Sequence, residues 1–452
     1  MKSKFLRRFL QIIVGILVVI LMLLAISIRR LDRTFYRQTD YYKHTVAQLE
    51  KTLKLLPPPV HNQLLVGAAK AGFTPPAGIP LAGFGNRKGA PSTSVHDSLF
   101  VRSIVLQSGE NLACIIGYDA LICPPHIARV IEDSLRNRLG LRPGQILFTA
   151  THTHSGPGGW SNGWVEEQFA GPPDSRVPAL FVDSTLVVVK RALHQIKPGS
   201  YGIGSVKAPS YIHNRLVGDE GEVDDELVYA TFSSGRKNIA VFVTYSAHAT
   251  VLSGRNFLFS GDYPGYLERK LESTLGGVVL FAAAAVGSGS PRGSGEAFER
   301  ARNIGNALAD SLLSHFPDAR NPNCTLRVFR ISAEKHDLQI HISENWRLAP
   351  WLARRFFHAE DSYLQVVSLD RFLVLGSPAE FSSELALKVK RHAQEKGMKV
   401  TVTSFNGCYI GYVTPSKYAD LAEYETRLMS FFGPYTGDYL AELMNRIVDR
   451  IY

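Results

Sequence analysis

The stretch that decides the fold is residues 112–159, LACIIGYDALICPPHIARVIEDSLRNRLGLRPGQILFTATHTHSGPGG. It begins with an apolar run at Leu112–Tyr118, continues with an amphipathic segment at His126–Leu139, and returns to an apolar run at Gln145–Thr151. Short runs rich in aliphatic residues are typical of buried strands, and a longer amphipathic segment is typical of a surface helix. The order predicts a β-α-β unit.

The same alternation recurs downstream of this unit. Apolar runs at Ile239–Ser246 and Gly277–Ala284 are each followed by a longer amphipathic segment, at Tyr263–Ser273 and Ala297–Leu313. Alternating strands and helices indicate a layered α/β domain. No repeat of 20–50 residues interrupts the chain after the N-terminal region. The sequence therefore predicts an α/β fold of layered mixed β-sheets flanked by helices, with one domain over residues 65–452.

The N-terminus contains a segment long enough to cross a membrane. No charged residue occurs from Phe9 to Ile28, and twenty helical residues at about 1.5 Å each reach about 30 Å, the thickness of a bilayer core. A cleaved signal peptide is the alternative, because Ala25-Ile26-Ser27 offers a small-x-small site. The apolar run exceeds the usual signal-peptide length and Arg29 follows at once, so we expect one uncleaved N-terminal transmembrane helix.

The anchor is expected to comprise residues 1–33, and a stalk or linker residues 34–64. Thr34–Leu56 is polar with scattered Leu and aromatic residues, and it stops at Pro57-Pro58-Pro59, through which no helix continues. Within residues 1–33, four Lys/Arg precede the apolar run and three follow it. This small excess favours a cytoplasmic N-terminus and an extracytoplasmic domain.

The net charge of +10 is concentrated at the anchor. Residues 1–33 carry seven Lys/Arg and one acid, Asp32, and so account for +6 of it. The remaining +4 is spread without a long basic run, which argues against nucleic-acid binding and for contact with anionic lipid near the anchor. The four cysteines have no C-x-x-C spacing, which disfavours a cysteine zinc site and leaves disulfides open.

Histidines follow two of the predicted strands. His152 and His154 stand two residues apart at the end of the Gln145–Thr151 run, where alternate side chains share a face. His248 follows the Ile239–Thr244 run in the same way. Imidazoles at strand ends are a common way to bind zinc, although solvated turn histidines and a core histidine are the alternatives. The two strand ends together favour a shared metal site.

Seven short motifs occur in a characteristic order from about Leu65 to the C-terminus. They are AGFTPP at 71–76, AGFG at 82–85, VHD at 95–97, THTHSGPGG at 151–159, HNR at 213–215, SPAEF at 377–381 and YIGYVT at 409–414. In sequence and order they resemble the catalytic domain of the neutral, non-lysosomal ceramidases. The resemblance implies that residues 65–452 form a catalytic domain that hydrolyses the amide bond of ceramide or another N-acylated lipid.

The resemblance also implies a zinc site. Its expected ligands are His152, His248, Glu380 and Tyr412. Two imidazoles, a carboxylate and a phenol oxygen are competent zinc ligands. Bound zinc lowers the pKa of water to about 7 and polarises a carbonyl, which suits amide hydrolysis. Zn²⁺ is therefore the expected cofactor.

Other positions are implied as catalytic residues. His154 is the expected acid/base, because an imidazole with an ordinary pKa of about 6.5 exchanges protons near neutrality. Arg215 or Tyr409 is expected near the developing oxyanion. Without the resemblance, Arg215 would pair with a surface acid, Glu380 would cap a helix at Phe381–Arg391, and the tyrosines would pack a sheet edge.

The loop after Gly277–Ala284 departs from the family pattern. Family members carry Gly-Asp-x-Ser-Pro-Asn there, whereas this chain has GSGSPR at 287–292, so Ser290 is kept without the acid and the amide. Gly72 also replaces an acid, and the chain ends at Tyr452 without the usual C-terminal domain. A role for Ser290 in catalysis or substrate binding is still implied, while the substrate stays open.

The residues are compatible with three functional classes. The first is a membrane-anchored zinc amidase that cleaves ceramide or a related N-acyl lipid to a fatty acid and a sphingosine-like amine. The second is a hydrolase of another amide or ester, with Ser290 as nucleophile and the histidines as base. The third is a non-catalytic relative that binds a lipid or protein at the membrane. We expect the first class.

Overall fold

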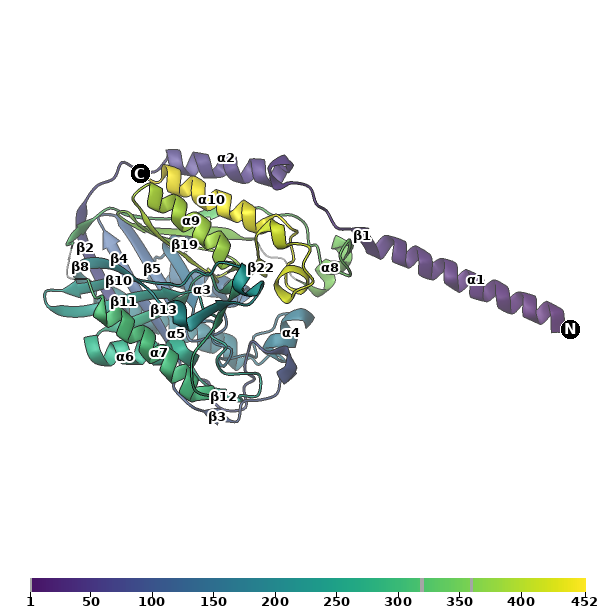
Figure 1. Ribbon diagram of the computed structural model, residues 1–452, viewed down its shortest axis with the longest axis horizontal. Coiled ribbons are helices and arrows are strands. Elements are labelled where there is room, and N and C mark those ends of the chain that lie inside the picture. The colour runs from purple at the N-terminus through teal and green to yellow at the C-terminus, as the bar shows by residue number, and fades with distance from the viewer. Residues whose placement is uncertain (1, 318–320, 358–360) are drawn as a thin grey trace.

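Three β-sheets lie at the centre of the protein, and helices cover their outer faces (Figure 1). The structure is a computed structural model that describes residues 2–317, 321–357 and 361–452. In the described part, the largest sheet has the order β15-β2-β4-β5-β6, with β7 paired to β2. Its strands are β2 (Asn62–Gly72), β4 (Phe100–Ser108), β5 (Asn111–Tyr118), β6 (Ile146–Ala150), β7 (Lys197–Pro198) and β15 (Asn323–Cys324).

The other two large sheets have four strands each. One has the order β13-β11-β10-β8, and the other has the order β16-β18-β19-β21. The first contains β8 (Ser200–Lys207), β10 (Glu226–Ser234), β11 (Lys237–Tyr245) and β13 (Val278–Ala283). The second contains β16 (Leu326–Ser332), β18 (Tyr363–Leu369), β19 (Phe372–Gly376) and β21 (Lys399–Thr403). Parallel and antiparallel pairs occur in all three sheets, as the sequence predicts.

The predicted β-α-β unit is present as β5, α3 (Pro125–Leu139) and β6. Helix α3 begins at a proline, whose fixed φ suits a first turn, and Gly140 follows its last residue at φ 72°. Its apolar residues Ile127, Ile131 and Leu135 are buried against the sheet and α5 (Arg176–His194). Strands β5 and β6 consequently pair in parallel, with Tyr118 beside Ala150.

Each sheet buries both faces. Apolar residues of all three sheets, such as Leu106, Phe242 and Val374, form one central core. Helices α3 and α5 cover the outer face of the largest sheet, and α6 (Asp262–Leu275) and α7 (Ala297–Ser314) cover the β8–β13 sheet. Helices α9 (Ser383–Glu395) and α10 (Thr436–Arg450) cover the third sheet. The predicted layered α/β architecture is confirmed.

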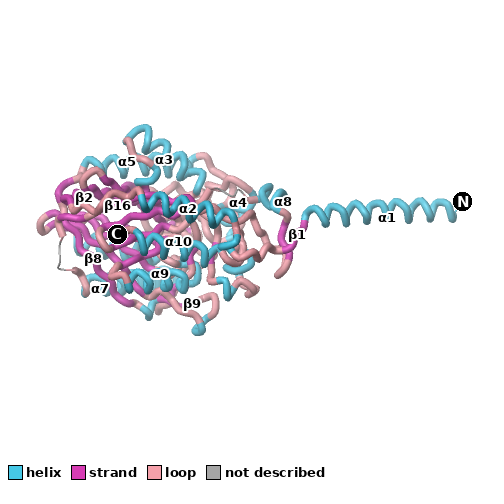
Figure 2. The backbone as a smooth tube through the Cα atoms, turned by 90° about the horizontal axis from the view of Figure 1, so that it is seen from above, coloured by secondary structure: helices cyan, strands magenta, loops and turns pink. Residues whose placement is uncertain are grey.

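Helix α1 (Lys2–Ser27) projects from this body (Figures 1 and 2). Within residues 4–27, an 18-residue stretch has a mean hydropathy of 3.2 and contains no buried residue, so the helix is long and apolar enough to cross a membrane. Strand β1 (Ile28–Arg30) follows at once and pairs antiparallel with β17 (Trp346–Leu348). The apolar helix therefore joins the body through a short sheet.

The segment predicted as a stalk packs onto the body over part of its length. Residues Asp40–Lys54 form α2, which begins at the N-cap Thr39 and buries Leu49 and Leu53 in the core of the third sheet and its helices. A polar segment with apolar residues at helical spacing covers a core in this way. The structure thus differs from an extended linker between residues 40 and 54.

All four cysteines are buried, and none forms a disulfide with another described residue. The disulfides that the sequence left open do not occur among them. Burial, with smaller contributions from Glu132 and Cys408, raises the pKa of the Cys123 thiol above its ordinary value, so this cysteine stays a protonated core residue.

Candidate metal centre

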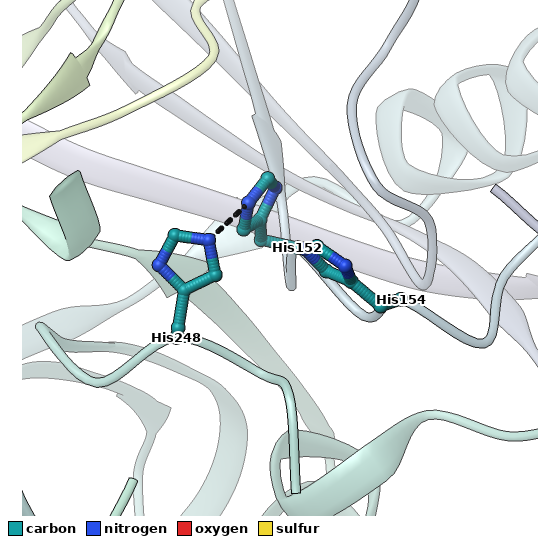
Figure 3. A group of neighbouring side chains, drawn as sticks. All are labelled: His152, His154 and His248. Carbon is teal, nitrogen blue, oxygen red and sulfur yellow. Dashed lines mark hydrogen bonds between the residues drawn. The ribbon is translucent and has the colours of Figure 1, made fainter. Parts of the chain in front are cut away.

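His152 and His154 lie close to His248 in the structure. The alternation of side chains along a strand does not bring them together. Strand β6 ends at Ala150, and His152 has a left-handed φ of 60°. The chain turns here, so His152 and His154 reach the same cavity from a loop. His248 comes from the loop after β11, where its N–H donates to Gly289 O at 3.0 Å. The three ring-nitrogen groups lie within 4.8 Å of one another (Figure 3).

The imidazoles of His152 and His248 face each other through their Nε2 atoms, which are 2.9 Å apart (Figure 3). Their Nδ1 atoms lie 2.7 Å from Leu121 O and 2.8 Å from Val286 O, respectively. A carbonyl only accepts, so each Nδ1 carries the proton and each Nε2 presents a lone pair. Two lone pairs that face each other in a buried site repel unless a cation lies between them.

Glu380 and Tyr412 complete the group. They lie on the short parallel pair β20 (Glu380–Phe381) and β22 (Tyr412–Val413), whose register places one directly beside the other. Glu380 Oε2 lies 3.5 Å from His152 Nε2 and 3.3 Å from His248 Nε2. Tyr412 Oη lies 3.4 Å from His248 Nε2. The four predicted metal ligands therefore converge on one point.

The chemistry of this group fits a zinc ion. Glu380 Oε2 is buried and has no hydrogen-bond partner, which is costly unless a cation binds there. Backbone carbonyls that orient the metal-facing histidines through Nδ1 are a usual outer shell of zinc sites. Nitrogen and oxygen donors at close range suit Zn²⁺.

The electrostatics of the group favour metal binding. Burial, helped by the Arg215 cation and His152, lowers the pKa of His248 to about 3, so its imidazole is neutral. Burial opposes ionisation of Glu380, but His152 and His248 stabilise its carboxylate and hold its pKa well below the usual range. The centre thus offers a neutral His248 imidazole and an ionised Glu380 carboxylate, the forms that bind a metal.

Arg215 and Tyr409 hold two of the ligands. Arg215 Nη2 donates to Tyr412 Oη at 2.9 Å, and its Nε lies 2.7 Å from Glu425 Oε1. Tyr409 donates to Glu380 Oε1 at 2.7 Å. Arg215 or Tyr409 was expected near the oxyanion, and in the structure both side chains contact candidate metal ligands. Such contacts orient ligands and leave Glu380 Oε2 toward the histidines.

His154 lies beside the centre without polar contacts. Both of its ring nitrogens are buried and without hydrogen-bond partners. Burial, together with His152 and His248, lowers its pKa well below the ordinary value, so the ring is neutral. Gly83, with φ 114°, leaves room for this ring, because a Cβ there would lie 2.5 Å from His154 Cγ. His154 is therefore available to a bound substrate.

Ser290 follows Gly289, whose carbonyl accepts the His248 N–H. It belongs to β14 (Gly289–Pro291), where it pairs with His213 on β9 (Ile212–Asn214). Among the described residues, its side chain makes no hydrogen bond to a histidine. The buried serine of this loop is Ser288, and its hydroxyl accepts the Ser383 N–H at 3.0 Å.

Two residues of the centre were missed by the sequence interpretation. The Phe405 ring stacks on His152 with ring centroids 4.2 Å apart, and Glu425 pairs with Arg215. Glu425 lies in the turn at Tyr424–Leu428, far from any quoted motif. Neither residue type carries a local signal, because each acts only through its position in the folded chain.

A pocket opens beside the metal ligands. His152, His154 and Glu380 line it together with Ile122, Phe169 and Met429. A second pocket adjoins it and shares Ile122, Phe169, Tyr409 and Met429. Its remaining wall is mostly apolar, formed by Trp160, Val165, Phe357 and Phe431 among others. The wall next to the polar centre is therefore largely apolar.

Comparison with known sequences identifies relatives. The profile of the family described as neutral/alkaline non-lysosomal ceramidase, N-terminal, matches residues 64–304 of the 452. A neutral ceramidase of Pseudomonas aeruginosa is 28% identical over 184 residues, which are 35% of this chain and 27% of that protein. A neutral ceramidase of Mycobacterium tuberculosis is 27% identical over 148 residues, 30% of this chain and 23% of that protein. The matched segments span about a quarter of these relatives.

Solved structures show the same fold. The crystal structure of neutral ceramidase from Pseudomonas aeruginosa superposes with a TM-score of 0.72 at 19% identity, covering 86% of this chain and 74% of that one. A structure of a ceramidase complexed with C2 gives a TM-score of 0.71 at 17% identity, covering 86% and 75%. The predicted family resemblance is thus confirmed across more than half of the chain. This protein belongs to the neutral/alkaline non-lysosomal ceramidase family.

Proposed function

We propose that this protein is a zinc-dependent amide hydrolase that cleaves the N-acyl bond of ceramide or a related N-acyl lipid. The products are a fatty acid and a sphingosine-like amine. The observation that carries the proposal is the convergence of His152 Nε2, His248 Nε2, Glu380 Oε2 and Tyr412 Oη in one buried group. These four side chains would hold the ion. When bound, zinc would lower the pKa of a water and polarise the amide carbonyl.

The protein's own residues supply positioning and proton transfer. His154 presents two unpartnered ring nitrogens to the pocket, so it is placed to take a proton from the attacking water and pass one to the leaving amine. Tyr409 keeps Glu380 in its metal-facing rotamer, and Arg215 does the same for Tyr412. Arg215 Nη2 also brings positive charge near the point where oxyanion charge develops.

The adjoining apolar pocket supports an acylated substrate. An acyl chain between Ile122, Phe169 and Phe431 would place its carbonyl next to the polar centre, because Ile122 and Phe169 line both pockets. Burying a chain among aromatic and aliphatic side chains contributes about 0.8 kcal/mol per methylene. Binding of a long-chain lipid is therefore favoured over a short-chain amide.

The membrane placement is part of the proposal. Helix α1 would span the bilayer as an uncleaved anchor, with the N-terminus in the cytoplasm and residues 65–452 outside as the catalytic domain. An anchor keeps the enzyme at the surface in which N-acyl lipids dissolve. Protection of an N-terminal tag from added protease in intact cells, with cleavage of a C-terminal tag, is the expected result.

A substrate panel tests the activity. The full chain is treated with a chelator, dialysed, and assayed with and without restored zinc on ceramides, N-acyl amino acids and a simple fatty ester. We expect hydrolysis of an N-acyl lipid that returns only with zinc. Full activity in the chelator, with no metal bound, would contradict the proposal and favour a serine mechanism.

A further inference from the structure

Three of the four tryptophans lie exposed at one end of the body. Trp164, Trp346 and Trp351 are 63%, 44% and 52% exposed, and Phe356 beside them is 44% exposed. We call these four residues the aromatic collar. They belong to α4 (Trp164–Ala170), β17 and α8 (Pro350–Phe356), and both views place α4 and α8 at the end from which α1 leaves the body (Figures 1 and 2). Large exposed apolar side chains gathered in one place indicate a contact surface.

The collar is joined directly to α1. Strand β1 pairs with β17 so that Arg30 lies opposite Trp346, and the Arg30 guanidinium lies 5.8 Å above the Trp346 ring. The Ala349 N–H donates to Ser27 O at 2.7 Å. The Trp351 indole N–H donates to Ile26 O at 3.1 Å, so this ring touches the last turn of the apolar helix. Backbone and side-chain contacts thus hold the collar to the end of α1.

The length of α1 places this turn at the edge of a bilayer. The charge-free run Phe9–Ile28 has twenty residues, which at about 1.5 Å each reach about 30 Å, the thickness of a bilayer core. Ile26 therefore lies where the hydrocarbon gives way to headgroups. Trp351, which is bonded to it, must lie at the same depth.

The charges around the collar suit that depth. Five arginines, Arg29, Arg30, Arg347, Arg354 and Arg355, lie on β1, β17 and α8. Tryptophan with arginine at the end of a spanning helix is typical of the membrane interface, where the rings lie among headgroups and the cations meet phosphates. A protein partner would not require this match to the depth of α1.

We propose that the aromatic collar docks into the interfacial layer of the bilayer that α1 spans, and so holds the pocket mouth against the lipid. The proposal rests on α1 spanning the membrane. The collar flanks the apolar pocket, because Trp164 precedes Val165 and Phe356 precedes Phe357, two residues of its wall. The Trp164 and Phe356 rings lie 6.2 Å apart. These two rings are in edge-to-face contact beside the pocket, so a lipid would enter the pocket alongside the docked collar.

Tryptophan fluorescence tests this docking without any assay of activity. Helix α1 contains no tryptophan, so all emission comes from the body. The full chain is reconstituted into phosphatidylcholine vesicles with a fifth of phosphatidylglycerol, and only protein that floats with the vesicles is measured. We expect emission in vesicles brominated at acyl carbons 6 and 7 to fall to about half of that in unbrominated vesicles, because collar rings lie at the interface.

The variant W164F/W346F/W351F is the matched control. It keeps only Trp160, which is buried and whose indole donates to Pro157 O at 2.9 Å. Its emission should be equal in the two kinds of vesicle. The single variants W164F, W346F and W351F should each lose part of the quenching, which gives a test if the triple variant fails to fold.

Equal wild-type emission in brominated and unbrominated vesicles would overturn the proposal. So would failure of the full chain to float with vesicles. Emission that changes with the protein-to-lipid ratio but not with bromine would assign the collar to contact with a second copy instead. Because zinc and substrate are absent from the measurement, its result is independent of whether the protein hydrolyses an N-acyl lipid.

Discussion

The Nε2 atoms of His152 and His248 lie 2.9 Å apart although the residues are 96 positions apart in the chain. Each imidazole is held by a backbone carbonyl through Nδ1, so the two lone pairs face each other beside Glu380 Oε2. This arrangement is stable only with positive charge between the donors. The geometry of these strand-end loops therefore supports the proposed cation between the donors.

Removal of either imidazole should remove the metal. In His152→Ala and His248→Ala, we expect bound zinc to fall from about one per chain to near zero and turnover to fall at least about 100-fold, because the ion supplies the reactive chemistry. Metal analysis of the purified protein and assay on an N-acyl lipid check this. His194→Ala, on the exposed end of α5, should change neither. Full activity of His248→Ala would contradict the assignment.

Gly83 is expected to be essential for the position of His154. Gly83→Ala places a Cβ at 2.5 Å from the His154 ring, so we expect turnover to fall about 10-fold with zinc content unchanged. Gly78→Ala is the matched control, since Gly78 also has a positive φ of 98° but nothing within 4 Å. Both variants should lose about 1 kcal/mol of stability through backbone strain. Equal turnover of the two variants would contradict a role for His154.

Ser290 separates the zinc mechanism from the serine mechanism. We expect Ser290→Ala to keep its zinc and to lower turnover about 10-fold, as a residue near the substrate would. Ser288→Ala should instead lower the free energy of unfolding by about 1 kcal/mol, because its hydroxyl accepts a buried N–H. Complete loss of activity in Ser290→Ala, with metal-free wild-type protein still active, would favour Ser290 as nucleophile.

The docking of the N-terminal segment on α10 should depend on pH. Burial opposes ionisation of Glu442, but hydrogen bonds from Tyr42, Tyr36 and Arg37 lower its pKa to about 2 from an ordinary 4.5. The native state thus favours the carboxylate, so this stability is present above pH 4.5 and is lost as pH falls toward about 2.

The variant Glu442→Gln checks the sign. At pH 7 we expect it to unfold at a lower temperature than wild type. The free energy of unfolding should fall by about 1 kcal/mol after allowance for solvent screening. The difference should shrink as the pH is lowered from 4.5 to 2.5, because the carboxyl of the unfolded wild-type chain then takes up a proton while the native carboxylate does not, which stabilises the unfolded state. Thermal unfolding followed by circular dichroism measures both proteins. A difference that is independent of pH would show that Glu442 acts by packing alone.

Several elements were predictable from local sequence. The β-α-β unit follows from apolar runs around an amphipathic segment, and the strand and helix at β13 and α7 follow in the same way. The docking of α2 was not predictable, because burial of Leu49 depends on a core formed by residues more than 200 positions later, from Ala285 to Ile451. Periodicity indicates which face of a helix is apolar, but it does not identify the element that packs against that face.

The sequence by itself determined the apolar N-terminal helix, the alternation of strands and helices, and the identity of the candidate ligands, since these depend on residue type, spacing and motif order. Only the tertiary structure decided that His152 and Glu380 meet, because the loops after β6 and β11 and the β20–β22 pair are brought together by the packing of the sheets and helices. It also decided that Tyr409 and Arg215 contact the candidate ligands, that Trp351 contacts the end of α1 and that Trp346 pairs with β1. Hydrogen bonds such as those from Arg215 to Tyr412 and from Trp351 to Ile26 join residues 197 and 325 positions apart, and they depend on packing that no local pattern encodes.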